Sequence, residues 1–191
     1  MKQLLWSLLF CIAPLTFAQQ DPPPDVALGP EQYLLAPDEA LEEIFGQFHT
    51  TVFDTVRVTQ TGKSQIEEHL HRTIPDTQYV VRQVYRNNTL IGYALVINEY
   101  GKYRPITMMV GVDPEFNIEG VRILVYRENR GGEVQRKRFL YQYRNKSSKD
   151  PIRINRDIIN VSGATISVRG VNAGVRKALH LVEYFYGDPP Q

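Results

Sequence analysis

Small and hydroxylated residues stand directly before the most helix-like stretch of this chain, in the run Ser162-Gly163-Ala164-Thr165. The backbone N–H groups at the start of a helix have no partner inside the helix, and together with the helix dipole they attract phosphate oxygens. Gly163 would let the backbone turn tightly beside such a ligand. The hydroxyls of Ser162, Thr165 and Ser167 could bind it as well. The run is therefore a candidate phosphate site, and the alternative is a simple helix cap with Thr165 or Ser167 at the N-cap position.

A second group of residues with binding chemistry follows a β-like stretch in the middle of the chain. Its members are Tyr126, Glu128, Arg130, Gly131 and Gly132. An arginine here could bind a phosphate or a ring carbonyl, whereas the alternative is a surface loop with an ordinary salt bridge. The basic, aromatic turn at residues 101–105 could face the same ligand, although a plain hairpin connection is the simpler account.

Composition restricts the chemistry further. The chain has 191 residues, a net charge of +1 and one cysteine. Because Cys11 lies in an apolar N-terminal stretch, removal of that stretch would leave no thiol for disulfides, iron–sulfur clusters or c-type haem. The balanced charge gives no electrostatic basis for nucleic-acid binding. Without a thiol, any redox chemistry would depend on a bound organic cofactor or on a metal held by nitrogen and oxygen ligands. His69 and His71 are two apart on an expected helix and cannot easily share such a metal.

The first 18 residues are typical of a secretory signal peptide. Lys2 precedes an apolar stretch that runs from Leu4 to Ala18 and ends with small residues at the two cleavage positions. That stretch is shorter than the roughly 20 residues that span a bilayer, so cleavage is favoured over an uncleaved anchor. Residues 19–30 are rich in proline and predict a flexible leader. We therefore expect an exported protein, periplasmic or on the outer face of the cytoplasmic membrane.

The elements that must position these residues follow from hydrophobic periodicity. Residues 31–78 predict an N-terminal helical extension, with helices at 31–48 and 63–72 and a short strand at 51–59. Closely spaced β-like segments and tight turns predict four antiparallel strands, at 79–85, 90–99, 105–113 and 118–126. We expect further helices at 133–144 and 167–185, with a short buried run at 157–161 between them. The fold class is therefore α+β, a twisted antiparallel sheet with a C-terminal amphipathic helix packed on it and additional N-terminal helices.

Four segments of the chain resemble, in the right order, the FMN-binding domain family. They are residues 107–126, 126–133, 139–143 and 161–167. The family includes the G subunit of Rnf electron-transport complexes and the C subunit of the sodium-translocating NADH:quinone oxidoreductase. The resemblance covers residues 79–183, and it implies that residues 79–187 form an FMN-binding domain.

The resemblance also implies a role for the small-residue run. A flavin transferase would esterify Thr165 with the FMN phosphate, and the flavin would lie across this turn and the Glu128–Gly132 loop. The protein would then relay electrons between donor and acceptor redox proteins, including a membrane reductase, in a membrane-associated complex. Such a protein is an electron carrier more than a stand-alone enzyme. In agreement, the sequence shows no catalytic dyad and no dinucleotide fingerprint after a strand.

One position departs from the family pattern. The motif usually has an aspartate three residues before the serine, where this chain has Ile159, and Asp157 lies two residues further upstream. This departure favours the rival interpretation, a non-redox ligand-binding or assembly module of the same fold that binds a phosphorylated ligand or a partner protein. A flavin reductase acting directly on a small substrate is a third possibility, for which the sequence shows no substrate-pocket signature.

Overall fold

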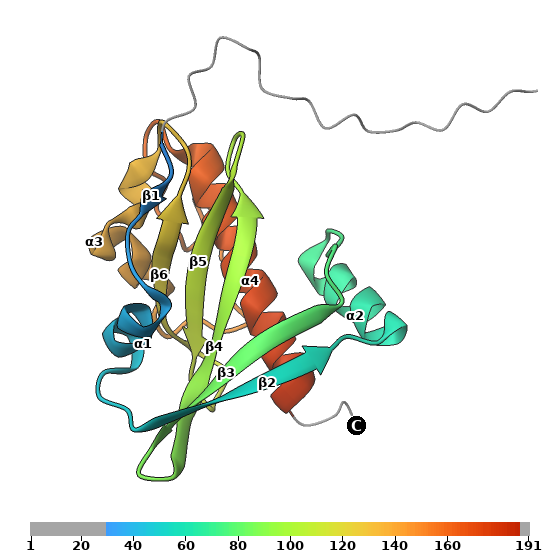
Figure 1. The fold of residues 1–191 in the computed structure, drawn as a ribbon. Coiled ribbons are helices and arrows are strands. Elements are labelled where there is room, and N and C mark those ends of the chain that lie inside the picture. Colours follow the sequence, from blue (N-terminus) through green and yellow to red (C-terminus); the bar gives the residue numbers. More distant parts are fainter. Residues whose placement is uncertain (1–29, 188–191) are drawn as a thin grey trace, which may run out of the picture.

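A six-stranded antiparallel sheet with the strand order β1-β6-β5-β4-β3-β2 forms the centre of the domain (Figure 1). This computed structural model describes residues 30–187. The predicted signal peptide (1–18) and all but the last residue of the predicted leader (19–30) lie outside that range. Within the described range, no helix combines the length and the apolar character needed to cross a membrane.

Strands β2 to β6 coincide closely with the strands predicted from the sequence. The six strands are β1 (Gln32–Tyr33), β2 (Thr50–Arg57), β3 (Gln78–Arg86), β4 (Thr89–Tyr100), β5 (Pro105–Val112) and β6 (Ile118–Tyr126). Asn87 and Asn88, with φ of +49° and +62°, join β3 to β4 in the left-handed conformation that tight hairpins need. The predicted α+β class with an antiparallel sheet is confirmed.

The segment before β3 is less helical than the sequence suggested. The helix expected over residues 31–48 is only α1 (Pro37–Phe45), because residues 32–33 instead form β1 against β6. Pro37 opens this helix, and the Glu39 side chain accepts the Ala36 backbone N–H at 3.2 Å. Residues 31–78 therefore contribute two strands to the main sheet, together with α1 and α2 (Gln60–Leu70).

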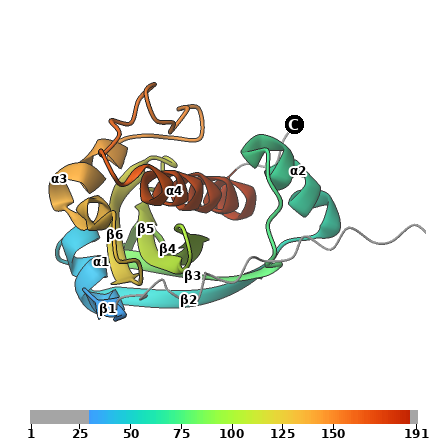
Figure 2. The same ribbon diagram turned by 90° about the horizontal axis from the view of Figure 1, so that it is seen from above.

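The two faces of the sheet carry different helices. Helix α4 (Thr165–Tyr186) lies along one face with α2 beside it, and α1 covers part of the other face (Figure 2). The predicted apolar stripe of α4 faces the sheet, and five of its members are fully buried: Val168, Val171, Val175, Ala178 and Val182. The apolar stripe thus packs as predicted.

Two other expectations between β6 and α4 were wrong. The helix predicted over residues 133–144 is divided into three short pieces, η1 (Gly132–Gln135), α3 (Lys137–Leu140) and η2 (Tyr141–Tyr143). Arg136 interrupts it because its backbone is extended, with ψ of 132°. In the run 157–161 Ile158 is buried, but the Ile159 side chain is 76% exposed. Only Ile158 of that run is therefore fully buried, and Val161 is partly buried against the core.

Two contacts fix α4 on the sheet. A Cβ atom on Gly170 would come within 2.7 Å of the backbone oxygen of Tyr100, so the helix approaches the end of β4 more closely than any other residue type would allow. Further along, Lys177 Nζ lies 2.5 Å from Glu99 Oε1, and both side chains are buried. These contacts set the height and the rotation of the helix, and with them the position of its first turn.

Candidate functional site

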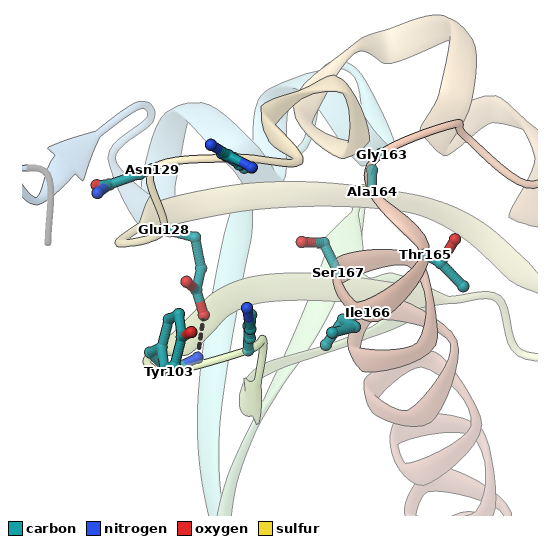
Figure 3. A pocket seen from close by; sticks show the side chains of 10 residues that line it. Tyr103, Glu128, Asn129, Gly163, Ala164, Thr165, Ile166 and Ser167 are labelled. Carbon is teal, nitrogen blue, oxygen red and sulfur yellow. Dashed lines mark hydrogen bonds between the residues drawn. The ribbon is translucent and has the colours of Figure 1, made fainter. Parts of the chain in front are cut away.

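A cleft of about 730 Å³ lies where the first turn of α4 meets two loops of the sheet (Figure 3). Residues 163–167 form one wall, residues 128–130 after β6 form the second, and residues 102–103 between β4 and β5 form the third. The two groups predicted from the sequence to bind a ligand are therefore brought to one place.

The first turn of α4 has no side-chain cap. Its N-cap residue is Ala164, and no side chain accepts a hydrogen bond from the first N–H groups. The predicted N-cap role for Thr165 or Ser167 is therefore wrong, because both residues lie inside the helix. The unpaired N–H groups and the positive end of the helix dipole remain available to an anion.

Gly163 directly precedes the N-cap and has a left-handed backbone, with φ of +78°. No atom lies within 4 Å of the position that a Cβ would take at Gly163. Glycine is thus favoured by the backbone conformation and not by crowding, and the space beside this turn is open to a ligand.

Thr165, the first residue of the helix, is half-buried and lines the cleft. Its Oγ1 accepts a hydrogen bond from Asn160 Nδ2 at 3.0 Å. The Thr165 side chain projects from the other side of the helix than that of Ser167, which points toward the Glu128 segment (Figure 3). The Thr165 hydroxyl therefore lies at the rim of the cleft, beside the Asn160 amide.

Tyr126 ties the loop after β6 to α4. Its hydroxyl donates to the Arg130 backbone oxygen at 2.6 Å and lies 2.9 Å from Ser167 Oγ. Because the tyrosine proton goes to Arg130, the Ser167 hydroxyl is the donor in the second bond, and its proton is not free for a ligand. Burial raises the pKa of Tyr126, and the hydrogen bond from Ser167 only partly opposes this effect.

Gly131 makes this connection possible. Its φ is +81°, and a Cβ atom there would lie 2.6 Å from Ser167 Oγ and 3.0 Å from Tyr126 Oη. Both the backbone conformation and the space therefore require glycine at this position. Gly131 and Tyr126 act by positioning the walls of the cleft and do not line it.

Glu128 holds the third wall in place. Its side chain is buried, and its Oε1 accepts the backbone N–H groups of Tyr103 at 2.6 Å and Arg104 at 3.0 Å (Figure 3). The hairpin turn at residues 101–105 is thus clamped by the carboxylate, and Lys102 and Tyr103 face the cleft as a result. The turn is both a hairpin connection and part of the site.

Six of the ten predicted site residues line the cleft: Gly163, Ala164, Thr165, Ser167, Glu128 and Arg130. Ser162 and Gly132, like Tyr126 and Gly131, do not line it. The sequence did not predict Asn129 and Ile166 as site residues, although both line the cleft. The only signal for them is that each lies between two predicted site residues in the chain. Lys102 and Tyr103 belong to the turn at 101–105, for which the sequence favours a plain hairpin connection over a place beside the ligand.

The cleft suits an anionic group attached to a flat, apolar one. Lys102 and Arg130 contribute positive charge, and the one lining carboxylate, Glu128, uses Oε1 for two backbone groups. The Tyr103 ring offers an aromatic face, over which the Lys102 ammonium lies at 4.7 Å from the ring centre. The uncapped helix start would bind the phosphate of such a ligand, and the aromatic wall would contact its ring.

Comparison with known proteins gives a consistent assignment. Residues 101–180 match the family model of the FMN-binding domain. A solved structure of Shewanella oneidensis NqrC aligns with a TM-score of 0.52 and 17% identity, over 76% of this chain and 85% of that one. The C subunit of the Na(+)-translocating NADH-quinone reductase from Parabacteroides distasonis aligns with a TM-score of 0.50 and 17% identity, over 75% and 80% respectively. At this identity the two structures show a shared fold, and no curated protein sequence matches the chain.

Proposed function

We propose that this chain is an exported electron-transfer protein with one FMN in the cleft at the start of α4. The match of residues 101–180 to the family model of the FMN-binding domain supports this proposal. The observation that carries the proposal is the uncapped first turn of α4, which faces a cleft with Lys102 and Arg130 on its other walls. This arrangement matches a ligand with a phosphate at one end and a flat ring at the other.

Different residues of the cleft would bind the phosphate and the ring of FMN. The N–H groups of the first turn of α4 would bind the phosphate, with Gly163 leaving room for it. Arg130 and Lys102 would add positive charge, and the Tyr103 ring would pack on the flavin. FMN supplies the redox chemistry when bound, because no side chain of the cleft can itself exchange electrons reversibly with a partner.

Thr165 is the residue proposed to carry the flavin covalently. Its hydroxyl is at the rim of the cleft, where the Asn160 amide holds it at 3.0 Å. Ser162 and Gly163 next to it are exposed, so a flavin transferase can reach the run. The donor would be a flavin dinucleotide. Thr165 Oγ1 would form a bond to the phosphorus on the flavin side of this donor. The bond from that phosphorus to the other nucleotide would break, and Thr165 would lose its hydroxyl proton.

The location and the partners complete the proposal. The signal-peptide pattern of residues 1–18 supports export to the periplasm or the outer face of the cytoplasmic membrane. The shared fold with a quinone reductase subunit supports a role among other redox proteins. The chain would then pass electrons between a donor and an acceptor protein in a membrane-associated complex.

Expression beside a flavin transferase tests the proposal. The purified protein should be yellow, and its flavin should stay with the chain after denaturation. Thr165→Val should abolish the flavin that survives denaturation, whereas Thr165→Ser should keep it because the hydroxyl remains. Colourless wild-type protein would reject the carrier and favour the rival, a non-redox module of the same fold. Yellow colour that is lost on denaturation would reject only the covalent bond.

Ile159 allows a sharper form of this test. Its side chain is largely exposed, although its backbone N–H donates to Gln142 Oε1 at 2.7 Å. An exposed substitution of this kind changes stability by about 0.5 kcal/mol or less. Ile159→Asp restores the residue usual in the family and should raise the flavinylated fraction if the transferase contacts this position. An unchanged fraction would show that the isoleucine does not limit attachment.

A further inference from the structure

We infer that this chain has a second anion site, a pocket of three arginines on the outer side of α4 that binds a phosphate group. The pocket has a volume of about 360 Å³ and lies between residues 152–155 and the middle of α4. The segment before α4 passes over the side of the helix that faces away from the sheet (Figure 2). The site is therefore separate from the cleft at the start of the helix.

Positive charge dominates the lining of this pocket. Arg153 comes from the segment before α4, and Arg169 and Arg176 come from the helix, while no aspartate or glutamate lines it. The full chain has a net charge of only +1, so the three charges are a local concentration. Guanidinium groups bind phosphate oxygens two at a time, which makes arginine a common phosphate ligand.

Carboxylates neutralise some arginines of the protein, and the arginines of this pocket are among those that are not neutralised in this way. Five arginines elsewhere form ion pairs with carboxylates at 2.6–2.9 Å: Arg72, Arg82, Arg122, Arg127 and Arg144. Among residues 30–187, none of the three pocket arginines forms such a pair. Arg176 donates only to the backbone oxygen of His69, at 2.8 Å. Their charge is therefore left for a group from outside the chain.

The charges also repel one another. Burial, and then the positive charges of Arg153 and Arg72, lower the pKa of the Arg176 guanidinium from its ordinary value. A bound dianion would remove this repulsion and would gain from each of the three guanidinium groups. The arrangement therefore favours an occupied pocket over an empty one.

The segment that carries Arg153 is held in a fixed shape. The Asp157 carboxylate accepts the backbone N–H of Ile152 at 3.0 Å and of Arg153 at 2.8 Å, and it pairs with Lys146 at 3.1 Å. This nearby carboxylate is thus already used and does not neutralise the pocket. Ile152 has a φ of +44°, which a β-branched residue rarely adopts, so the position of Arg153 is imposed by its surroundings.

Asn172 adds neutral donors to the same pocket. Its Oδ1 accepts the buried Tyr143 hydroxyl at 2.6 Å, so the two amide N–H groups of Asn172 remain for a ligand. Arg169, Asn172 and Arg176 are spaced three and four residues apart, and they share one side of α4. Three guanidinium groups and an amide match a phosphate dianion, either free or at the end of a small phosphate ester.

Titration of the flavin-loaded protein with inorganic phosphate at constant ionic strength tests the inference. We expect saturable shifts of the side-chain N–H signals of Asn172 and the pocket arginines in ¹H–¹⁵N spectra. The double variant R169Q/R176Q should lower the affinity at least about tenfold, since it removes two charged donors. The matched control R156Q removes an exposed arginine that does not line the pocket, and it should change the affinity less than about twofold.

Three results would overturn the inference. The first is the absence of saturable shifts at these side chains. The second is an equal loss of affinity in R156Q, which would mean diffuse charge attraction only. The third is binding only in flavin-free protein, which would place the phosphate in the cleft of the proposed FMN site. If the double variant does not fold, R153Q replaces it, because Arg153 is exposed.

Discussion

Replacing Glu128 by alanine should loosen one wall of the cleft and lower the stability of the domain. The Glu128 side chain is buried, and its Oε1 accepts the N–H groups of Tyr103 at 2.6 Å and Arg104 at 3.0 Å. A hydrogen bond to a charged group contributes about 1.5–3 kcal/mol, and two would contribute about 3–6 kcal/mol. Since the turn lies near the surface, water can solvate the freed groups, and we expect a loss of about 3 kcal/mol.

Two companion variants sharpen this expectation. Glu128→Gln keeps an oxygen acceptor but loses its charge, so it should cost about 1 kcal/mol. Glu119→Ala removes a carboxylate that pairs with a half-exposed Arg144 at 2.6 Å, and such a pair contributes less than about 1 kcal/mol. Glu128→Ala should therefore lose clearly more stability than either companion variant.

Urea unfolding of the flavin-free protein, monitored by circular dichroism, measures the free energy of unfolding of each variant. The reasoning fails if Glu128→Ala lies within about 1 kcal/mol of the wild type, or if the glutamine variant is as unstable as the alanine variant. In the flavin-loaded protein, Glu128→Ala should also make the flavin more accessible to an external quencher, because Lys102 and Tyr103 are no longer held. Unchanged accessibility would show that this wall does not cover the flavin.

Three further variants probe the packing of α4. Lys177→Met should cost about 2 kcal/mol in urea titrations, because Glu99 Oε1 loses its closest partner while Glu99 Oε2 keeps its ion pair with Arg72 at 2.9 Å, and adding Glu99→Leu should restore much of the loss. A glycine-to-alanine change inside a helix usually stabilises it by about 1 kcal/mol. Gly170→Ala should instead lower the melting temperature, because the new Cβ would come too close to the Tyr100 backbone oxygen. Burial, the largest cause, lowers the pKa of His180 from 6.5 to about 4. The unfolded chain therefore binds more protons between these values, and stability should fall by about 2 kcal/mol as the pH drops from 6.5 to 4, whereas His180→Gln should flatten this dependence.

Much of the fold could be predicted because its elements have strong local patterns. The four central strands are rich in apolar and β-branched residues over eight residues or more, and the stripe of α4 is continuous. The errors occurred where the local signal is short. The strand β1 has two residues and exists through its pairing with β6, and a single extended residue, Arg136, divides the helix expected over 133–144.

The candidate site was predicted in part for the same reason. The small residues before α4 and the loop at Glu128 are both visible in the sequence. The roles inside the site were not, because they depend on which side chains meet. Glu128, which was expected to face a ligand, lines the cleft and also holds a turn some 25 residues away in sequence, and Ser167 donates its proton to Tyr126.

The sequence by itself determined the helix of α4, the small-residue run before it and the four central strands, since each depends on neighbours within a few residues. The tertiary structure alone decided that the first turn of α4 is uncapped, that Tyr126 reaches Ser167 across 41 positions, and that Arg153 lines one pocket with Arg169 and Arg176. These contacts form only when α4 lies across the sheet. Their geometry depends on close approaches such as Gly170 on Tyr100, which no local pattern encodes.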